Sequence, residues 1–414
     1  MRVNLSVAIV AMVKKSHEES LTNENSTLES CPMGQNSNSN NSGNISSNVV
    51  GEFTWNEKTQ GFILGSFYYS YGLANLIGGP TADYFGGRML IGVATLASAI
   101  LTILTPMASR LGAGFLITIR VLEGCFHGVT FPAMNKLITK WYTTEERSKF
   151  TGIIFAGIDF GCVLTFPISG WLCESEFLGG WPSVFYVFGG LSIIWCLFWF
   201  TLIRDDPKKH PRISAEELKY ILEGSPNTEQ KHPVPWSSIL GSKYFWTTVI
   251  AQTGLIFGYI VMLSELPTYF ANILHIPINN NGLLTAMPFL AAWIFSMCYS
   301  FAVDKAIKSE YLTILSVRRL SVAISGYGPM LCLIGMCFVN CNVGGAFAVL
   351  ILSGALVSTV YCGPFSSHSD LSPRFAGTLM GLATAFGATI YELFITTEVQ
   401  PWNEPKTMNE KVEK

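Results

Sequence analysis

The chain has 414 residues, of which 49% are hydrophobic and only 13% are charged. The charged share is about half that of a soluble globular domain, so the composition excludes an ordinary water-soluble protein and favours one that is dissolved in lipid. The formal net charge of −2 argues against nucleic-acid binding, which usually shows as a strong basic excess.

Ten apolar runs have the roughly 20 residues that cross a bilayer. In chain order they lie at 60–80, 89–108, 112–135, 150–172, 181–203, 244–268, 281–303, 320–339, 344–365 and 375–397. An eleventh apolar run, at 3–13, is only about half that length and predicts the end of a first span whose beginning is missing. The sequence therefore predicts an all-α membrane protein with about ten to eleven spans.

The first polar segment, residues 14–58, is rich in Asn and Ser. A composition so poor in apolar side chains cannot bury a core, so the segment is predicted to be a disordered loop. It carries glycosylation sequons at Asn25, Asn40 and Asn44, which favour a position outside the cytosol. We therefore expect a glycosylated loop on the extracellular or luminal side of the membrane.

The second polar segment, residues 204–243, is rich in charged residues. It predicts a cytosolic linker that divides the chain into two helical bundles. The N-terminal bundle is expected at 1–203 and an incomplete C-terminal bundle at 244–397, followed by a polar tail at 398–414.

Lys and Arg indicate which side of the membrane each loop faces, because cytosolic loops are enriched in them. Most of these residues lie around Arg88 and Arg374 and in the segments 140–149, 204–243 and 304–319. Loops that are poorer in Lys and Arg alternate with these, so all the basic loops fall on one side, the cytosol. The Asn/Ser-rich loop falls on the other side, in agreement with its sequons.

A short motif lies in the predicted cytosolic loop after the second span. Residues 78–88 read GGPTADYFGGR, which resembles the signature loop of the major facilitator superfamily, G-x-x-x-D-x-x-G-[GR]-R. Gly79 and Gly86 permit tight turns. Asp83 can cap or pair at a helix end, and Arg88 can hold a neighbouring helix. The resemblance predicts a cytosolic gate that stabilises one of two rocking states, and the alternative is an ordinary charged turn.

Four further stretches resemble the anion:cation symporter family, which includes sodium–phosphate cotransporters, sialin-type lysosomal carriers and vesicular glutamate transporters. They are RVNLSVAIVAMV at 2–13, FTWNEKTQGFILGSFYYSYG at 53–72, RVLEGCFHGVTFPAMN at 120–135 and DLSPRFAGTLMG at 370–381. The resemblance covers nearly the whole chain, and the run that begins at Arg120 is the most specific part of it.

This resemblance implies a major facilitator fold of two six-helix bundles, so a chain with ten to eleven spans is expected to be truncated at both ends. It also implies symport of inorganic phosphate or organic anions with Na⁺ or H⁺ by alternating access, with no cofactor besides the coupling ion. The segment EVQPWN at 398–403 resembles sodium-dependent phosphate cotransporters more than glutamate carriers.

Three ionisable residues lie on one stripe of the fourth predicted span. Arg120 and Glu123 are three residues apart, and His127 follows one turn later on the same helix face. A charged side chain inside a span costs about 2.5–3.5 kcal/mol to insert, so each is a functional candidate. Arg120 can bind an anion through its guanidinium fork, while Glu123 and His127 can take up the coupling cation. The alternative is an ion pair that only holds the bundle together, and the family often has a carboxylate at the position of His127.

Two further charges lie in predicted spans. Arg2 matches an arginine of the family that resembles a ligand of the substrate anion, although it could instead extend to the membrane interface. Asp159 is an isolated acid in the fifth span, where the family more often has an uncharged residue. It could take part in cation coupling or be a neutralised packing residue.

The sequence indicates neither an ATP-driven pump nor an enzyme, because it has no GxxxxGK[ST] loop and no Ser/His/Asp or metal-binding constellation. Five cysteines inside apolar runs, none in a CxxC pair, indicate packing residues rather than metal ligands: Cys125, Cys162, Cys196, Cys332 and Cys362. We expect a monomer in the plasma membrane that carries a small anion and binds no nucleic acid. Two alternatives stay open: a proton-coupled lysosomal or vesicular organic-anion carrier, and a truncated membrane protein that does not transport.

Overall fold

The computed structural model describes residues 1–14, 51–143, 146–224, 236–272, 278–339, 342–372 and 375–394. Within these ranges the chain is helical, and the only β-type pairing is an isolated bridge between Val13 and Phe53. The all-α prediction is confirmed. The sequons at Asn25, Asn40 and Asn44 lie outside the described residues.

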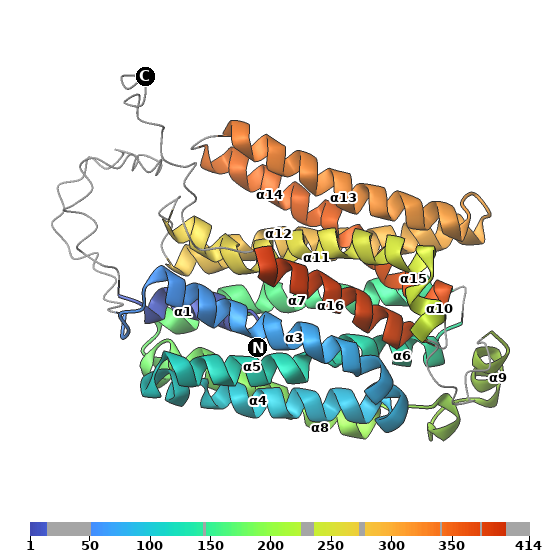
Figure 1. Cartoon of the computed structure of the whole chain (residues 1–414), viewed down its shortest axis with the longest axis horizontal. Helices are drawn as coiled ribbons and strands as arrows, with labels where there is room; N and C mark the ends of the chain where they lie inside the picture. Colours follow the sequence, from blue (N-terminus) through green and yellow to red (C-terminus); the bar gives the residue numbers. More distant parts are fainter. Residues whose placement is uncertain are drawn as a thin grey trace, which may run out of the picture.

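The helices of the first half of the chain, α1 to α8, run side by side (Figure 1). They are α1 (Asn4–Met12), α3 (Glu57–Phe85), α4 (Gly87–Leu111), α5 (Ala113–Gly128), α6 (Thr130–Trp141), α7 (Arg147–Glu174) and α8 (Pro182–Leu202), with a 3₁₀ turn, η1, at Phe177–Gly179. Helix α3 begins just after Asn56, whose side chain accepts a hydrogen bond from the Thr59 backbone amide, so the predicted loop at 14–58 ends two residues earlier than expected.

The second half consists of α11 to α16, and short helices precede it in the linker (Figure 1). The linker holds η2 (Pro207–Lys209), α9 (Ala215–Gly224) and α10 (Trp236–Leu240). The second half contains α11 (Lys243–Asn272), α12 (Ile278–Lys308), α13 (Ile314–Val339), α14 (Val343–Val357), η3 (Ser358–Tyr361), α15 (Pro364–Leu371) and α16 (Ala376–Phe394).

Eight helical segments of the described chain are long and apolar enough to cross a membrane. They correspond to eight of the ten predicted runs. The other two predicted runs are also helical. Helix α3 is long enough to cross a membrane but is more polar than the eight segments, and the apolar described part of α16, Ala376–Phe386, is shorter than a span. The polar character of α3 comes from residues such as Asn75 and Thr81, whose side chains donate to backbone carbonyls of the same helix.

Two of the predicted spans are broken near their middle. Helix α5 gives way to α6 at Val129, and α14 gives way to α15 through η3 and Gly363. Each break is followed by a proline, Pro132 or Pro364, which lacks the N–H that a continuous helix would use. Interrupted backbone at membrane depth is tolerated where it borders a protein cavity, and both breaks lie beside the cavity described below.

The two halves meet along two helix pairs. Helix α7 packs against α12, and α16 lies between α3 and α11 (Figure 1). Glycines permit this close approach: a Cβ added at Gly79 of α3 would lie 2.5 Å from the Cα of Thr378 in α16, and one at Gly282 of α12 would lie 2.6 Å from the carbonyl oxygen of Phe166 in α7. The structure therefore joins the halves through backbone-to-backbone contact.

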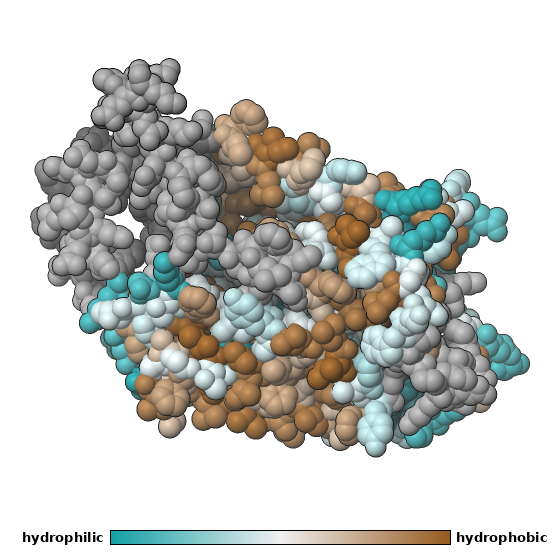
Figure 2. All heavy atoms as spheres, in the orientation of Figure 1, coloured by the Kyte–Doolittle hydropathy of each residue, from teal (hydrophilic) through white to brown (hydrophobic). Residues whose placement is uncertain are grey.

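The outer surface is apolar around the middle of the molecule. Figure 2 shows hydrophobic residues across the middle of the visible face and hydrophilic ones gathered towards its two ends. Large apolar side chains such as Leu197 of α8 and Leu331 of α13 are more than 60% exposed. An apolar belt between polar ends is the surface that a bilayer requires. The chain is a multi-pass integral membrane protein.

Candidate functional site

The Arg120–Glu123 pair of α5 is buried in the first half. Both residues are 3% exposed, and Arg120 Nη1 lies 2.7 Å from Glu123 Oε2. The other carboxylate oxygen accepts a hydrogen bond of 2.8 Å from Thr102 Oγ1 of α4. The predicted stripe therefore faces the inside of the bundle, and the charges of Arg120 and Glu123 compensate each other.

His127 lies one turn further along α5, at the end of that helix. Its ring packs against Phe67 of α3, with 5.8 Å between the ring centroids. Within the described part of the chain, the imidazole has no hydrogen-bond partner and takes no part in the Arg120–Glu123 ion pair. The structure brings Arg120 and Glu123 together and leaves His127 beside them as a separate group.

Arg2 precedes α1 and reaches the same region from another direction. Its guanidinium carbon lies 5.0 Å from the ring centroid of Tyr68, 5.2 Å from that of Tyr71 and 5.7 Å from that of Phe67. Its backbone oxygen accepts a weak hydrogen bond of 3.4 Å from Arg120 Nη2. Among the described residues Arg2 has no ion-pair partner, and its buried Nε atom has no hydrogen-bond partner.

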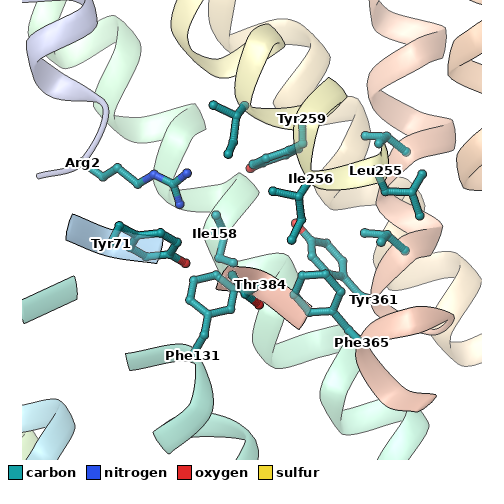
Figure 3. Close-up of a pocket in the computed structure, with 13 residues that line it drawn as sticks. Arg2, Tyr71, Phe131, Ile158, Leu255, Ile256, Tyr259, Tyr361, Phe365 and Thr384 are labelled. Carbon is teal, nitrogen blue, oxygen red and sulfur yellow. The ribbon is translucent and has the colours of Figure 1, made fainter. Parts of the chain in front are cut away.

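The Arg2 side chain points into a cavity between the two halves (Figure 3). Its walls are almost wholly apolar or aromatic. The polar members are Arg2, Thr384 and three tyrosines, namely Tyr71, Tyr259 and Tyr361. The remaining members are two phenylalanines and six aliphatic residues: Phe131, Phe365, Ile158, Leu255, Ile256, Ile260, Val357 and Val360. Both broken spans contribute to it, through Phe131 and through Tyr361. We call this space the central cavity.

A smaller hollow lies on the other side of Arg2 and is lined by residues of both halves, including Arg120, Tyr68 and Ser264. The Tyr68 and Ser264 hydroxyls lie 3.4 Å apart across the boundary between the halves. Arg120 thus borders the smaller hollow, whereas Arg2 borders both spaces. The geometry makes Arg2, rather than Arg120, the cation of the central cavity.

Asp159 of α7 is fully buried at the boundary between the halves. Tyr259 of α11 donates to its Oδ1 over 3.1 Å, and Tyr361 of η3 donates to its Oδ2 over 3.0 Å. Both tyrosines also line the central cavity. The structure therefore places Asp159 in contact with the cavity walls and away from Glu123 and His127.

The gate motif lies at the opposite end of α3 from its Asn56 cap. Gly86 has a φ of +85°, and the backbone N–H of Arg88 donates to Asp205 Oδ1 over 2.8 Å. The Arg88 guanidinium donates to the backbone oxygen of Phe200, the end of α8. Arg88 thus holds α8 and the start of the linker. The Asp83 side chain lies outside what the structure describes.

The aromatic and hydroxyl side chains of the central cavity were not identified from the sequence. Tyr259, Tyr361 and Thr384 lie inside apolar runs, where an uncharged aromatic or hydroxyl residue indicates packing as readily as function. For Tyr361 the sequence offers one indication of a functional position, because the residue lies shortly before Gly363 and Pro364, which interrupt the helix.

Comparisons with known proteins agree with the architecture. The Major Facilitator Superfamily matches residues 34–391. Human sialin is 37% identical over 394 residues, which cover 94% of this chain and 77% of sialin. A Drosophila ananassae protein named "Putative inorganic phosphate cotransporter" is 35% identical over 389 residues, covering 92% of this chain and 78% of that protein. The chloroplastic ascorbate transporter of Arabidopsis thaliana is 35% identical over 338 residues, covering 81% of this chain and 61% of that protein.

Solved structures with the same fold include the proton:xylose symporter XylE bound to 6-bromo-6-deoxy-D-glucose. It superposes with a TM-score of 0.65 at 14% identity, covering 82% of this chain and 79% of XylE. An inward-open structure of XylE gives a TM-score of 0.59 at 13% identity, with 81% of this chain and 79% of XylE covered. At such identities the likeness shows the fold alone, and the predicted fold is confirmed.

Proposed function

The chain belongs to the anion:cation symporter family of the major facilitator superfamily, and from this premise we propose that it carries an organic anion with an apolar body, bound by Arg2, in symport with a cation. It is a membrane transporter and not an enzyme. The identity of the substrate is the proposal, and it is supported by the lining of the central cavity.

The main support for this proposal is the Arg2 guanidinium, which has no ion-pair partner among the described residues and points into an aromatic and aliphatic cavity (Figure 3). A buried cation that lacks a counter-ion is costly, so an anion that binds it gains affinity from charge and hydrogen bonding together. Arg2 is positioned to bind a carboxylate in this way, while the apolar walls bind the rest of the molecule.

Inorganic phosphate fits this lining less well. It is small, strongly hydrated and multiply charged, so a site for it must replace its water with several donors. The described wall of the cavity offers one guanidinium, three tyrosine hydroxyls and Thr384, and two of those hydroxyls already donate to Asp159. A carboxylate with an apolar body needs fewer donors and uses the walls.

The proposed transport cycle is alternating access about the α3–α16 and α7–α12 pairs, with the central cavity opening to one side at a time. Arg120 supports Arg2 by donating to its backbone oxygen. Towards the cytosolic side, Gly79 keeps α3 in close contact with α16, and Arg88 holds the last turns of α8. The coupling cation is Na⁺ or H⁺, for which Glu123, His127 and Asp159 are the intramembrane candidates. We place the carrier in the plasma membrane with Asn25, Asn40 and Asn44 facing outwards.

Uptake into proteoliposomes tests the proposal with three labelled anions under the same gradients: 4-hydroxyphenylacetate, glucuronate and inorganic phosphate. We expect saturable uptake of the aryl carboxylate, with weaker uptake of the sugar acid and the weakest of phosphate. Liposomes without protein correct for passive entry. Uptake of phosphate alone, driven by a Na⁺ gradient, would instead support a phosphate cotransporter.

A further inference from the structure

Asp159 forms a direct bridge between the two halves. It belongs to α7 of the first half, and both of its carboxylate oxygens accept hydrogen bonds from the second half, from Tyr259 of α11 and Tyr361 of η3. The two distances are 3.1 and 3.0 Å, and the exposed fraction of Asp159 is 0%. Any change in the charge of this carboxylate therefore acts on the contact between the halves.

The surroundings of Asp159 contain no compensating cation at ion-pair distance among the described residues. The titratable groups near it are the two tyrosines, Cys162 on its own helix, Arg2 from the segment before α1, which borders the same cavity, and the buried Met1 amino group, which lies near Cys162. Arg2 is thus the side-chain cation of the cavity wall that Asp159 contacts, although the two form no ion pair.

A count of buried charges follows from these contacts. Arg120 and Glu123 form an ion pair and cancel each other. Of the ionisable side chains beside the central cavity, Arg2 and Asp159 remain, one positive and one negative: Arg2 lines the cavity, and Asp159 is bonded to two tyrosines that line it. The buried Met1 amino group lies near Cys162, Arg120 and Glu123 and is counted in its neutral form. The empty cavity is therefore neutral when Asp159 is ionised. An anion bound to Arg2 would leave one negative charge unbalanced in a medium where such a charge is costly.

We propose that Asp159 is the proton-binding site that couples the carrier, taking up one proton for each monovalent anion that binds at Arg2. The inference rests on the proposed function and specifies its coupling ion. The empty carrier and the carrier loaded with both anion and proton are neutral at this site. The carrier loaded with the anion alone is not, so its reorientation is suppressed and the anion does not move without the proton.

The tyrosines allow the second half to respond to the proton. An ionised carboxylate accepts two charge-assisted bonds, one from each tyrosine. A protonated carboxyl accepts from one hydroxyl and donates to the other, and these neutral bonds are weaker. Glu123 is less suited to this task, because its ion pair with Arg120 stabilises the charged carboxylate, whereas the partners of Asp159 are neutral hydroxyls.

The variant Asp159→Asn separates the possible outcomes, because it fixes the neutral form with little change in shape. With the anion bound, Arg2 and the anion cancel, so exchange of labelled for unlabelled anion across the membrane is retained and falls far less than net accumulation. The empty variant retains the unbalanced Arg2 charge, so net accumulation driven by a pH gradient falls by about a hundredfold. The matched control is Glu265→Gln, an exposed acid on α11, which keeps both activities.

Tyr259→Phe and Tyr361→Phe test the bridge itself. Each removes one hydroxyl that donates to Asp159 and leaves the ring in place, so the pH at which net uptake is half-maximal shifts. An unshifted pH profile in the double variant contradicts the role of the tyrosines.

Two results would overturn the proposal for Asp159: full pH-driven accumulation by the Asn variant, or loss of exchange together with net uptake. Wild-type uptake that follows Na⁺ and ignores pH also rejects it, while leaving the proposed function intact. An absence of any anion flux in the wild type rejects the proposed function instead.

Discussion

Two arginines lie close together in the first half and are in opposite situations. Arg120 is 3% exposed and forms a 2.7 Å ion pair with Glu123, which Thr102 also holds. Arg2 faces the central cavity and lies near three aromatic rings, with no ion-pair partner among the described residues. In the first arrangement a carboxylate of the protein balances the guanidinium charge, whereas in the second no described acidic side chain does so.

This difference separates two uses of a charge inside a membrane. A paired charge that loses its partner destabilises the fold, because the partner remains buried and unpaired. An unpaired cation beside a cavity contributes little to folding but attracts an anionic ligand. The same residue type should therefore give a transport defect at one position and a folding defect at the other.

The largest effect is expected for Arg2→Ala. Loss of two charge-assisted hydrogen bonds to the anion costs about 3 kcal/mol, which lowers kcat/KM for uptake by about a hundredfold. The melting temperature in detergent should stay close to that of the wild type, because Arg2 has no ion pair to lose. Initial rates in proteoliposomes and a thermal unfolding curve measure the two quantities.

Arg2→Lys is the matched variant at the same position. It keeps the charge but removes the planar fork, so we expect an intermediate loss of uptake. Normal uptake by Arg2→Ala would remove Arg2 from the site and make Arg120 the anion ligand.

A smaller defect in uptake, with a larger one in stability, is expected for Arg120→Ala. Breaking the buried pair leaves Glu123 uncompensated and lowers the free energy of unfolding by about 3–5 kcal/mol. The double variant Arg120→Ala/Glu123→Ala removes both charges and should recover most of that loss. If the single variant is as stable as the wild type yet transports nothing, Arg120 binds substrate directly, as the sequence first indicated.

Thr102→Val gives a smaller effect on the same pair. It removes the donor to Glu123 Oε1, so one buried carboxylate oxygen loses its hydrogen bond at a cost of about 2 kcal/mol. Thr105→Val is the control, because among the described residues the Thr105 hydroxyl bonds only to the Leu101 carbonyl of its own helix. Equal melting temperatures for the two variants would show that Thr102 does not support the pair.

The sequence allowed the Arg120–Glu123 contact to be predicted, because a spacing of three residues on one helix is local geometry. It also predicted the ten helical runs, since their lengths and composition are local as well. The unpaired state of Arg2 and the Asp159–Tyr259–Tyr361 bridge could not be predicted. Both depend on which helices of the two halves meet, and uncharged tyrosines in apolar runs carry no periodic signal of such contacts.

The smallest effect is expected at Phe67, whose buried ring lies near both arginines, 4.9 Å from the Arg120 guanidinium carbon and 5.7 Å from that of Arg2. Phe67→Leu removes a cation–π contact of about 0.5–1 kcal/mol from Arg2, so the KM for the anion should change by a few-fold. Phe166→Leu is the matched control, because Phe166 is equally buried but packs against Phe289, and no arginine of the described chain lies over its ring. Both variants should lose similar stability through the lost ring volume. Only Phe67→Leu should change the KM for the anion, because of the two rings only Phe67 contacts the Arg2 guanidinium that binds it. An equal change in KM in both variants would assign the effect to packing alone.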